Sequence, residues 1–320
     1  MPFSDIKGQA APVALLRRSL AAGKIAHAYI FEGIEGCGKK KTALALVKAI
    51  FCGEAQVCGK CPACRKVDAL QHPDLHMVEP DGAFIKIDQI RELQRELSYR
   101  PFEAGKKVCV MEAAERLNPA AANAFLKTLE EPPGNALLIL LTTNADAVLP
   151  TILSRCQRLS FSPLPSELVE ECLGEAGVPA EAAKVAASLA GGSMKKALEI
   201  SAEDILLKRG NLLEKIADLS QKEISPLFSL AEELGSDRDA AMEALDLLTV
   251  FLRDVLLMQS GGMEPANSDL LPLLNEEVAR STPEQTMGKI ELVSRSRQAL
   301  LRNVNPRLTM EVLFMGLSGC

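Results

Sequence analysis

The sequence contains a glycine-rich loop of the kind that holds phosphate groups. Gly33 and Gly38 are separated by four residues and followed by Lys39, which matches the first seven positions of the P-loop pattern. Glycines, Gly36 among them, let successive backbone N–H groups turn toward a phosphate, and the helix that follows adds partial positive charge. Lys39 would reach the terminal phosphates of a nucleotide. The alternative is a glycine turn that serves packing or subunit contact.

The position after Lys39 departs from this pattern. A P-loop ATPase has Ser or Thr there, and its hydroxyl binds Mg²⁺, whereas this chain has Lys40. An ammonium group cannot ligate a metal ion and repels it. Thr42 cannot supply the hydroxyl instead, because two residues along a helix turn about 200° around its axis. Binding of ATP with Mg²⁺ by this chain is therefore left open.

A second position that ATP hydrolysis requires is altered as well. P-loop ATPases place an acidic pair after a buried strand, with one carboxylate for Mg²⁺ and one to activate water. Here the apolar run 108–111 is followed by Glu112 and Ala113, so one carboxylate is present and the base is missing. Glu115 is expected to face elsewhere. Because two independent positions differ, we predict that ATPase activity is weak or absent.

Four cysteines follow the loop and its helix within a short segment. Two residues separate Cys58 from Cys61 and Cys61 from Cys64, and Cys52 precedes them. Four thiolates in a tight loop suit tetrahedral Zn²⁺, and an odd, clustered set of nine cysteines argues against disulfides. An iron–sulfur cluster is the rival, but its pattern needs a further cysteine where Asp68 stands. We expect a structural zinc site.

The elements that position these residues alternate between strand and helix. Apolar runs predict buried strands at residues 28–31, 72–78, 107–111 and 137–141, and helical spacing predicts helices at 13–23, 40–50, 87–97 and 119–131. This alternation implies a parallel α/β sheet. The glycine loop lies between the first strand and a helix, which is the context that supports a P-loop.

The pattern changes at Pro163 and Pro165, which mark a joint between domains. From there to the end nearly every segment has helical spacing. A length of 320 residues exceeds the usual size of one core. We expect an α/β domain over residues 1–162 with the cysteine module 52–64 inserted, a small helical domain over 163–205 and a larger helical domain over 206–320.

Composition and charge exclude several classes of protein. With 48% hydrophobic and 24% charged residues, the chain is not disordered, collagen-like or a coiled-coil rod. A net charge of −6 argues against a protein that grips DNA alone through many phosphate contacts. The longest apolar run, residues 136–141, is far shorter than a membrane span, and no secretion signal begins the sequence. We expect a cytoplasmic location and no membrane contact.

Several segments together resemble the AAA+ clamp-loader subunits of bacterial DNA polymerase III. They are residues 27–31, the P-loop, the cysteine cluster, residues 123–133 (Asn-Ala-Phe-Leu-Lys-Thr-Leu-Glu-Glu-Pro-Pro), residues 141–144 and residues 149–156 with Ser-Arg-Cys at the end. The altered P-loop, the missing base and residues 303–311 resemble the delta-prime branch rather than the gamma/tau motor. The resemblance implies an AAA+ P-loop domain with a parallel sheet, a small helical lid and a C-terminal all-helical collar.

The resemblance also implies partners and a role. The loader is a hetero-pentamer with gamma/tau and delta subunits that uses ATP to open the sliding clamp and place it on primed DNA. A delta-prime subunit offers an arginine, by position Arg155, in trans to the ATP site of its neighbour. A guanidinium suits this task because it stabilises charge on the transferring phosphoryl group. The alternative is an ordinary arginine at a strand-to-loop junction.

Further site residues follow from the resemblance. Asn144 stands where the family keeps a polar sensor of the γ-phosphate, and the alternative is a turn cap. Lys195 takes the place of a second sensor, which is usually Arg, and it lacks the planar fork. The zinc module of the family has a longer gap before its cysteine triplet, so His72 or His76 is an alternative to Cys52 as the fourth ligand.

Two other functions are alternatives. An active gamma/tau-type clamp-loader ATPase would need a hydroxyl after Lys39 and a carboxylate at position 113, and neither is present. A P-loop kinase of a small metabolite is the second. The long helical half of the chain and the lack of a small-substrate pocket signature count against it.

Overall fold

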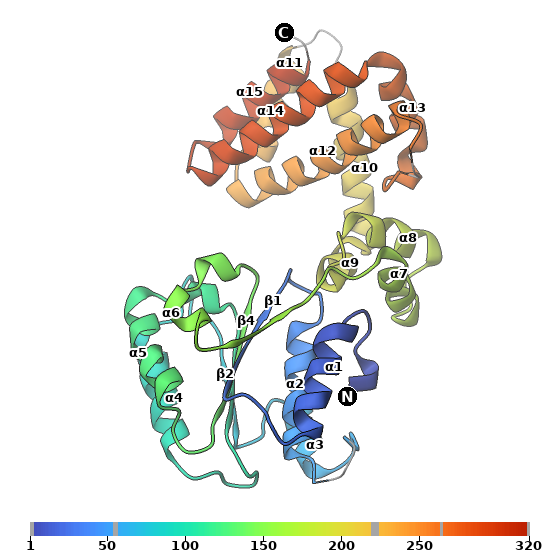
Figure 1. Ribbon diagram of the computed structural model, residues 1–320. Coiled ribbons are helices and arrows are strands. Elements are labelled where there is room, and N and C mark those ends of the chain that lie inside the picture. The colour runs from blue at the N-terminus through green and yellow to red at the C-terminus, as the bar shows by residue number, and fades with distance from the viewer. Residues whose placement is uncertain (1–2, 54–56, 219–223, 263–264, 319–320) are drawn as a thin grey trace. The chain divides into compact units, whose positions relative to one another are not determined.

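The structure, a computed structural model, describes residues 3–53, 57–218, 224–262 and 265–318 (Figure 1). The chain divides into two compact units, Met1–Val169 with Gly191–Lys195 and Glu170–Ala190 with Lys196–Cys320. The first unit contains a parallel sheet with helices, and the second is helical. The predicted fold class is therefore confirmed, while the division into three domains stays a prediction.

Five parallel strands form the sheet of the first unit, in the order β2-β3-β4-β1-β5. They are β1 (Ala28–Glu32), β2 (Leu75–Val78), β3 (Val108–Met111), β4 (Leu137–Thr142) and β5 (Gln157–Ser160). The first four match the predicted strands. The sequence analysis missed β5 because Leu159 is its one buried residue, and an edge strand of this kind has no apolar run.

Helices cover both faces of this sheet (Figure 1). One face carries α1 (Ala10–Ala21), α2 (Lys39–Phe51) and α3 (Pro62–Asp68), and the other carries α4 (Ile87–Ser98), α5 (Pro119–Glu130) and α6 (Pro150–Leu153). Short 3-10 turns lie at Phe3–Asp5, Ala114–Arg116 and Ala145–Ala147. This three-layer arrangement explains why the central strands read as continuous apolar runs, since both of their faces are buried.

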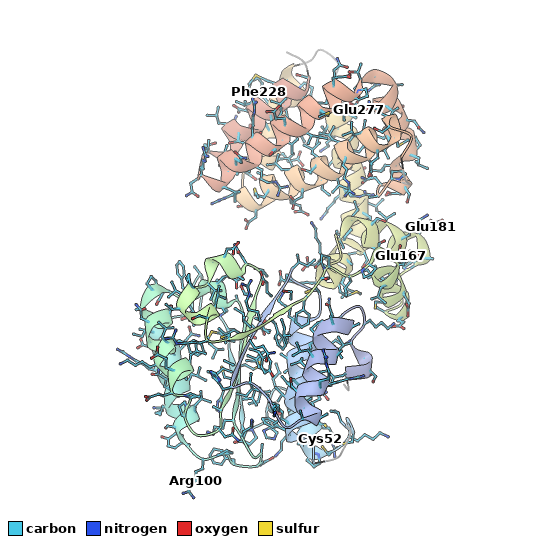
Figure 2. All side chains as sticks on the ribbon, in the orientation of Figure 1. Cys52, Arg100, Glu167, Glu181, Phe228 and Glu277 are labelled. Carbon is cyan, nitrogen blue, oxygen red and sulfur yellow. The ribbon has the colours of Figure 1, made fainter. Side chains whose placement is uncertain are left out.

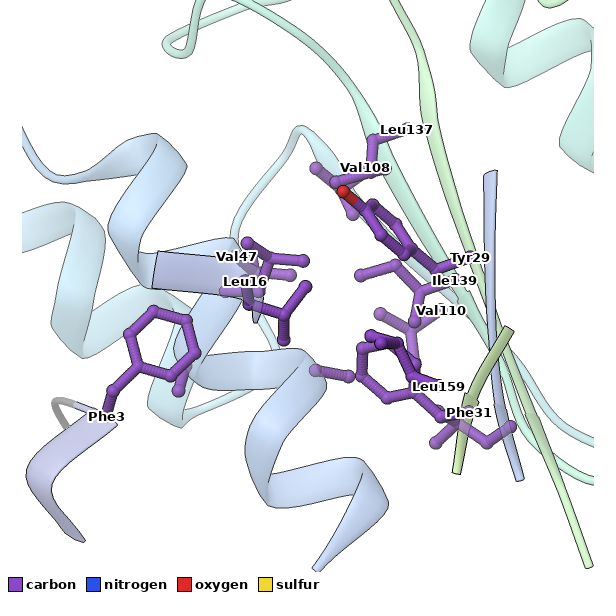
Figure 3. Close-up of a cluster of buried hydrophobic side chains, with 14 of the residues drawn as sticks. Phe3, Leu16, Tyr29, Phe31, Val47, Val108, Val110, Leu137, Ile139 and Leu159 are labelled. Carbon is purple, nitrogen blue, oxygen red and sulfur yellow. The ribbon is translucent and has the colours of Figure 1, made fainter. Parts of the chain in front are cut away.

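The apolar core on one face of the sheet is shown in Figure 3. Tyr29 and Phe31 of β1 and Ile139 of β4 point toward Leu16 of α1 and Val47 of α2. The alternate residues of β1 point to the other face, where Ile30 joins a second core. Because side chains alternate along a strand, one short segment anchors helices on both sides.

The second unit is built from helices. Helix α7 (Ser166–Glu175) crosses from the first unit into the second, and α9 (Met194–Ile200) begins in the first unit. The others are α8 (Ala180–Leu189), α10 (Glu203–Asp218), α11 (Ile224–Leu234), α12 (Arg238–Gln259), a 3-10 turn (Ser268–Leu270), α13 (Leu271–Arg280), α14 (Pro283–Leu301) and α15 (Pro306–Leu317). Helix α12 packs against α14, and α11 packs against α15. Among the described helices, none is both long enough and apolar enough to cross a membrane.

Candidate functional site

The glycine-rich loop joins β1 to α2 at the carboxyl edge of the sheet. Gly36 and Gly38 have φ angles of 78° and 105°, which favour glycine over residues with a side chain. A Cβ on Gly36 would lie 2.5 Å from Oγ of Ser193 and 2.7 Å from the backbone nitrogen of Lys195. At Gly38, in contrast, no described atom lies within 4 Å of such a Cβ. The loop is packed on one side and open on the other.

Lys39 is folded back onto the loop. Its Nζ donates hydrogen bonds to the carbonyl oxygens of Gly33 at 2.5 Å and of Ile34 at 2.7 Å. The residue is 8% exposed, and burial lowers the pKa of its ammonium group. The first helical hydrogen bond of α2 runs from the amide of Thr42 to Gly38, so the amides of the first turn have no partner within the helix. These groups have the chemistry of a phosphate site.

Lys40 is held at the same edge by two carboxylates. Its ammonium forms an ion pair with Glu112 and lies 3.4 Å from Oε1 of Glu79. Burial opposes the charge, but the hydrogen bond and charge of Glu112 outweigh it and raise the pKa of Lys40. The hydroxyl of Thr42 donates to the carbonyl of Gly38 at 2.8 Å. The residues at this position therefore do not fit a bound Mg²⁺ ion.

Glu115 corrects one expectation, because it does not face away from this edge. Its carboxylate accepts hydrogen bonds from the hydroxyls of Thr142 and Thr143, both at 2.7 Å. Burial raises the pKa of this carboxyl, but the hydrogen bonds outweigh it and the net pKa is lowered. Ala113, at a φ of 49°, opens the 3-10 turn that brings Glu115 back. The direction of this turn depends on a single residue in the left-handed region, and such a residue leaves no apolar pattern in the sequence. The position of Glu115 could therefore not be predicted from apolar spacing.

The two residues in sensor positions have partners within the first unit. The Oδ1 of Asn144 accepts a hydrogen bond from the amide of Asp146 at 3.0 Å, which is the turn cap considered as the alternative. Lys195 forms an ion pair with Glu35 of the glycine loop at 2.7 Å and so lies beside that loop. Contact of either side chain with a nucleotide stays a prediction.

Arg155 lies between α6 and β5 with a partly exposed side chain. Its Nη2 lies 2.6 Å from Oε1 of Glu130, the last residue of α5. Its Nη1 donates to the carbonyl oxygen of Thr151 at 3.0 Å. The side chain is 36% exposed. The guanidinium is thus held by acceptors from α5 and from the end of α6 while part of it faces solvent.

The four cysteines predicted as metal ligands lie together. All four sulfur atoms are within 4.8 Å of one another, with Cys52 at 3.7 Å from Cys58 and 4.0 Å from Cys61. Four thiolates around a zinc ion at 2.3 Å would be about 3.8 Å apart in a tetrahedron. Cys52 is the C-cap of α2 and lies at the edge of the first unit (Figure 2). The cluster could therefore hold a metal ion without rearranging its backbone.

Local hydrogen bonds favour the thiolate form of Cys58, one of the four cysteines. The amide of Cys61 donates to the sulfur of Cys58 at 3.3 Å, and the amide of Cys64 donates to the sulfur of Cys61 at 3.4 Å. Backbone amides of Lys60 and Cys61 lower the pKa of Cys58 to about 6. This favours the thiolate, the form that binds metals.

Neither of the histidines considered as substitutes for Cys52 belongs to the cysteine group. The ring of His72 packs against Phe51 with centroids 4.3 Å apart, and its Nδ1 accepts from the amide of Asp74 at 3.2 Å. His76 lies in β2. Among the described residues, the group with metal-binding geometry consists of the four cysteines. Cys52 is therefore favoured over either histidine.

The first unit defines the class of this protein: an α/β domain with a parallel sheet and a glycine-rich loop between β1 and α2, to which a helical region is joined. A family model described as DNA polymerase III, delta subunit, matches residues 8–165, and one described as its C terminal matches residues 203–318. The delta' subunit of DNA polymerase III from Bacillus subtilis (strain 168) is 33% identical over 310 residues, which cover 95% of this chain and 94% of that protein. The chain belongs to the delta-prime family of DNA polymerase III clamp-loader subunits.

Other relatives are consistent with this family. The delta' subunit from Pseudomonas aeruginosa is 36% identical over 212 residues, which cover 63% of this chain and 64% of that protein. The tau subunit from Bacillus subtilis (strain 168) is 30% identical over 342 residues, which cover 97% of this chain and 60% of that protein. The tau subunit is thus longer than this chain.

Proposed function

We propose that this chain completes the ATP site of a neighbouring gamma/tau subunit with Arg155 and hydrolyses little or no ATP itself. The observation that carries the proposal is the placement of Arg155, which follows α6 with its guanidinium ordered by Glu130 and partly exposed. A cation presented at a surface in this way can reach the phosphates of a nucleotide bound to another subunit. A deeply buried arginine could not.

Weak hydrolysis by the chain itself is supported at three positions. Lys40 replaces the hydroxyl that binds Mg²⁺ and is paired with Glu112. Ala113 offers no base. The carboxylate of Glu115, although it lies at the right edge, is occupied by the hydroxyls of two threonines. Steady ATP turnover by the purified chain would contradict this part of the proposal and favour the gamma/tau-type alternative.

The partners proposed are gamma/tau and delta subunits in a hetero-pentamer, with the sliding clamp and primed DNA engaged by the assembly. Residues 206–320 would form a collar domain, residues 163–205 a lid and residues 1–162 the P-loop domain. Large apolar side chains are exposed at the end of α14, in the connection that follows it and on α15, namely Leu301, Val304, Leu308 and Val312. Exposed apolar side chains of this size support a role in subunit contact.

The cysteine cluster is proposed as a structural zinc site. The sulfur spacing suits a tetrahedral ion, and the ligands are four thiolates with no open position for a substrate. In this role Cys52, Cys58, Cys61 and Cys64 would hold the ion and fix the connection from α2 to α3.

The experiment that tests the main proposal is the ATPase rate of a reconstituted loader with Arg155→Ala. An arginine finger accelerates hydrolysis about 10³-fold or more at the site it completes. With Arg155→Ala, hydrolysis at that one site should therefore become negligible. The total ATPase rate of the loader should drop by the amount which that site contributed. Arg158→Ala is the matched control, since Arg158 is an exposed arginine paired with Glu32 at 2.7 Å. An unchanged rate with Arg155→Ala, in a loader that still assembles, contradicts the proposal.

A further inference from the structure

The carboxyl ends of β2 and β3 carry two acidic residues that share one lysine. Glu79 and Glu112 each follow directly after their strand, and the last residues of the two strands, Val78 and Met111, are partners in the sheet. The two carboxylates are therefore neighbours at the edge where the glycine loop lies. Lys40, in the first turn of α2, makes an ion pair with each of them.

A lysine at the start of a helix is normally unfavourable. The N-terminus of a helix carries partial positive charge, which repels a cation, and the first turn of α2 contains no acidic residue of its own. Two carboxylates from the sheet offset this repulsion at Lys40. Lys41, the next residue, is exposed and makes no ion pair among the described residues. The positive charge of Lys40 is thus compensated by two carboxylates, whereas the charge of Lys41 is not.

Lys40 also stands at the P-loop position where, in the usual pattern, a Ser or Thr side chain ligates the divalent cation. Carboxylates and a hydroxyl are the oxygen ligands that Mg²⁺ prefers. Here the carboxylates are present, and the hydroxyl is replaced by an ammonium group that neutralises them. The other hydroxyl nearby, that of Thr42, donates to a backbone carbonyl.

We propose that the Lys40 ammonium is a permanent, built-in replacement for the divalent cation at this edge of the sheet, so that the chain does not respond to Mg²⁺. The pair of carboxylates has the ammonium as its counter-charge without a bound metal, and these ion pairs tie the start of α2 to the ends of β2 and β3. This goes beyond the proposed role of Arg155, because it concerns the chain's own loop. A loader subunit with this replacement would keep one local structure while Mg²⁺ and nucleotide come and go at its neighbours.

The test is to remove the ammonium group of Lys40 by substitution and to measure how the chain responds to divalent cations. Lys40→Thr restores the hydroxyl and frees both carboxylates, and Lys41→Thr is the matched control on the adjacent residue. The melting temperature and the affinity for a fluorescent ATP analogue are measured for each full-length chain with Mg²⁺ and with a chelator. Mn²⁺ binding followed by electron paramagnetic resonance supplies a readout that needs no nucleotide.

The expected result is a response to cations in Lys40→Thr alone. Its nucleotide affinity should rise about tenfold or more when Mg²⁺ replaces the chelator, and Mg²⁺ should raise its melting temperature. The wild-type chain and Lys41→Thr should show neither change. Adding Glu112→Gln to Lys40→Thr should abolish the response, because one of the two carboxylates is lost.

Two results would overturn the proposal. One is a wild-type chain whose nucleotide affinity and Mn²⁺ binding increase with the cation as much as those of Lys40→Thr. The other is a folded Lys40→Thr chain that shows no response to Mg²⁺ or Mn²⁺. Neither result depends on Arg155, so a failure here is distinguishable from a failure of the proposed arginine finger.

Discussion

The guanidinium of Arg155 and the carboxylate of Glu130 lie 2.6 Å apart and join two distant segments of the chain. Glu130 ends α5, and Arg155 follows α6. A planar guanidinium that donates to a carboxylate on one side and to the carbonyl of Thr151 on the other has a fixed direction. Glu130 is therefore a positioning residue for Arg155, which the sequence analysis did not identify.

Glu130→Gln is expected to lower the ATPase rate of the assembled loader without affecting the fold. An exposed ion pair contributes about 0.2–1 kcal/mol, so the free energy of unfolding should change by less than about 1 kcal/mol. The loss of the charge leaves the guanidinium without its directing partner. Glu130→Asp, which retains the charge, should recover part of the rate. If Glu130→Gln lowers stability and activity together, the pair has a structural role only.

Removal of metal from the cysteine cluster is expected to destabilise the first unit. The purified chain should contain about one zinc ion per molecule, and a chelator should lower its melting temperature because binding energy is folding energy at such a site. Cys52→Ser should reduce both the zinc content and the melting temperature. Cys156→Ser is the control, since Cys156 lies outside the group. Full zinc content in Cys52→Ser would show that another residue supplies the fourth ligand.

Apolar patterning accounts for the part of the fold that the sequence predicted correctly. Four strands and the helices between them are buried on continuous or periodic apolar faces, and these features are local in the chain. Helix α3 was missed, although Cys61 at its N-cap and Pro62 at its first position are a start signal. The cysteine spacing predicts a metal-binding loop at this segment rather than a helix.

The partners of the site residues could not be predicted in the same way. The sequence identified Lys40, Glu112 and Lys195 as residues of interest, but the ion pairs of Lys40 with Glu79 and of Lys195 with Glu35 join positions far apart in the chain. Which acidic residue meets which lysine depends on strand order. No local pattern encodes the order β2-β3-β4-β1-β5.

Lys48 of α2 and Asp68 of α3 form an ion pair, and substituting one partner or the other is expected to lower the free energy of unfolding by different amounts. Lys48 is buried, with a side chain 2% exposed, whereas its partner Asp68 is about half exposed at 52%. Asp68→Asn leaves an uncompensated buried charge and should cost about 2–4 kcal/mol of unfolding free energy. Lys48→Met leaves a carboxylate that water can solvate, so its cost should be smaller. Chemical denaturation of the two variants checks the order, and equal losses would contradict it.

Asp74 is expected to give the chain a stability that depends on pH. Its buried carboxylate accepts hydrogen bonds from the amides of Phe102, Glu103 and Ala104 at 2.7–2.8 Å. Burial alone would raise the pKa of this carboxyl, but the three amides outweigh it and hold the pKa below its ordinary value of 3.8. A pKa lowered by folding stabilises the native state above the ordinary value, and the stabilisation is lost as pH falls through the folded value.

Asp74→Asn should therefore cost about 3 kcal/mol near neutral pH, because an amide side chain cannot accept all three hydrogen bonds and brings donors of its own toward them. The difference from wild type should stay constant from about pH 8 to pH 5 and shrink below about pH 4, as the wild-type carboxyl is protonated. Asp88→Asn is the control, since Asp88 is exposed on α4. Denaturation curves across this range measure both variants, and a difference that persists undiminished at low pH would mean that the charge of Asp74 does not hold this loop.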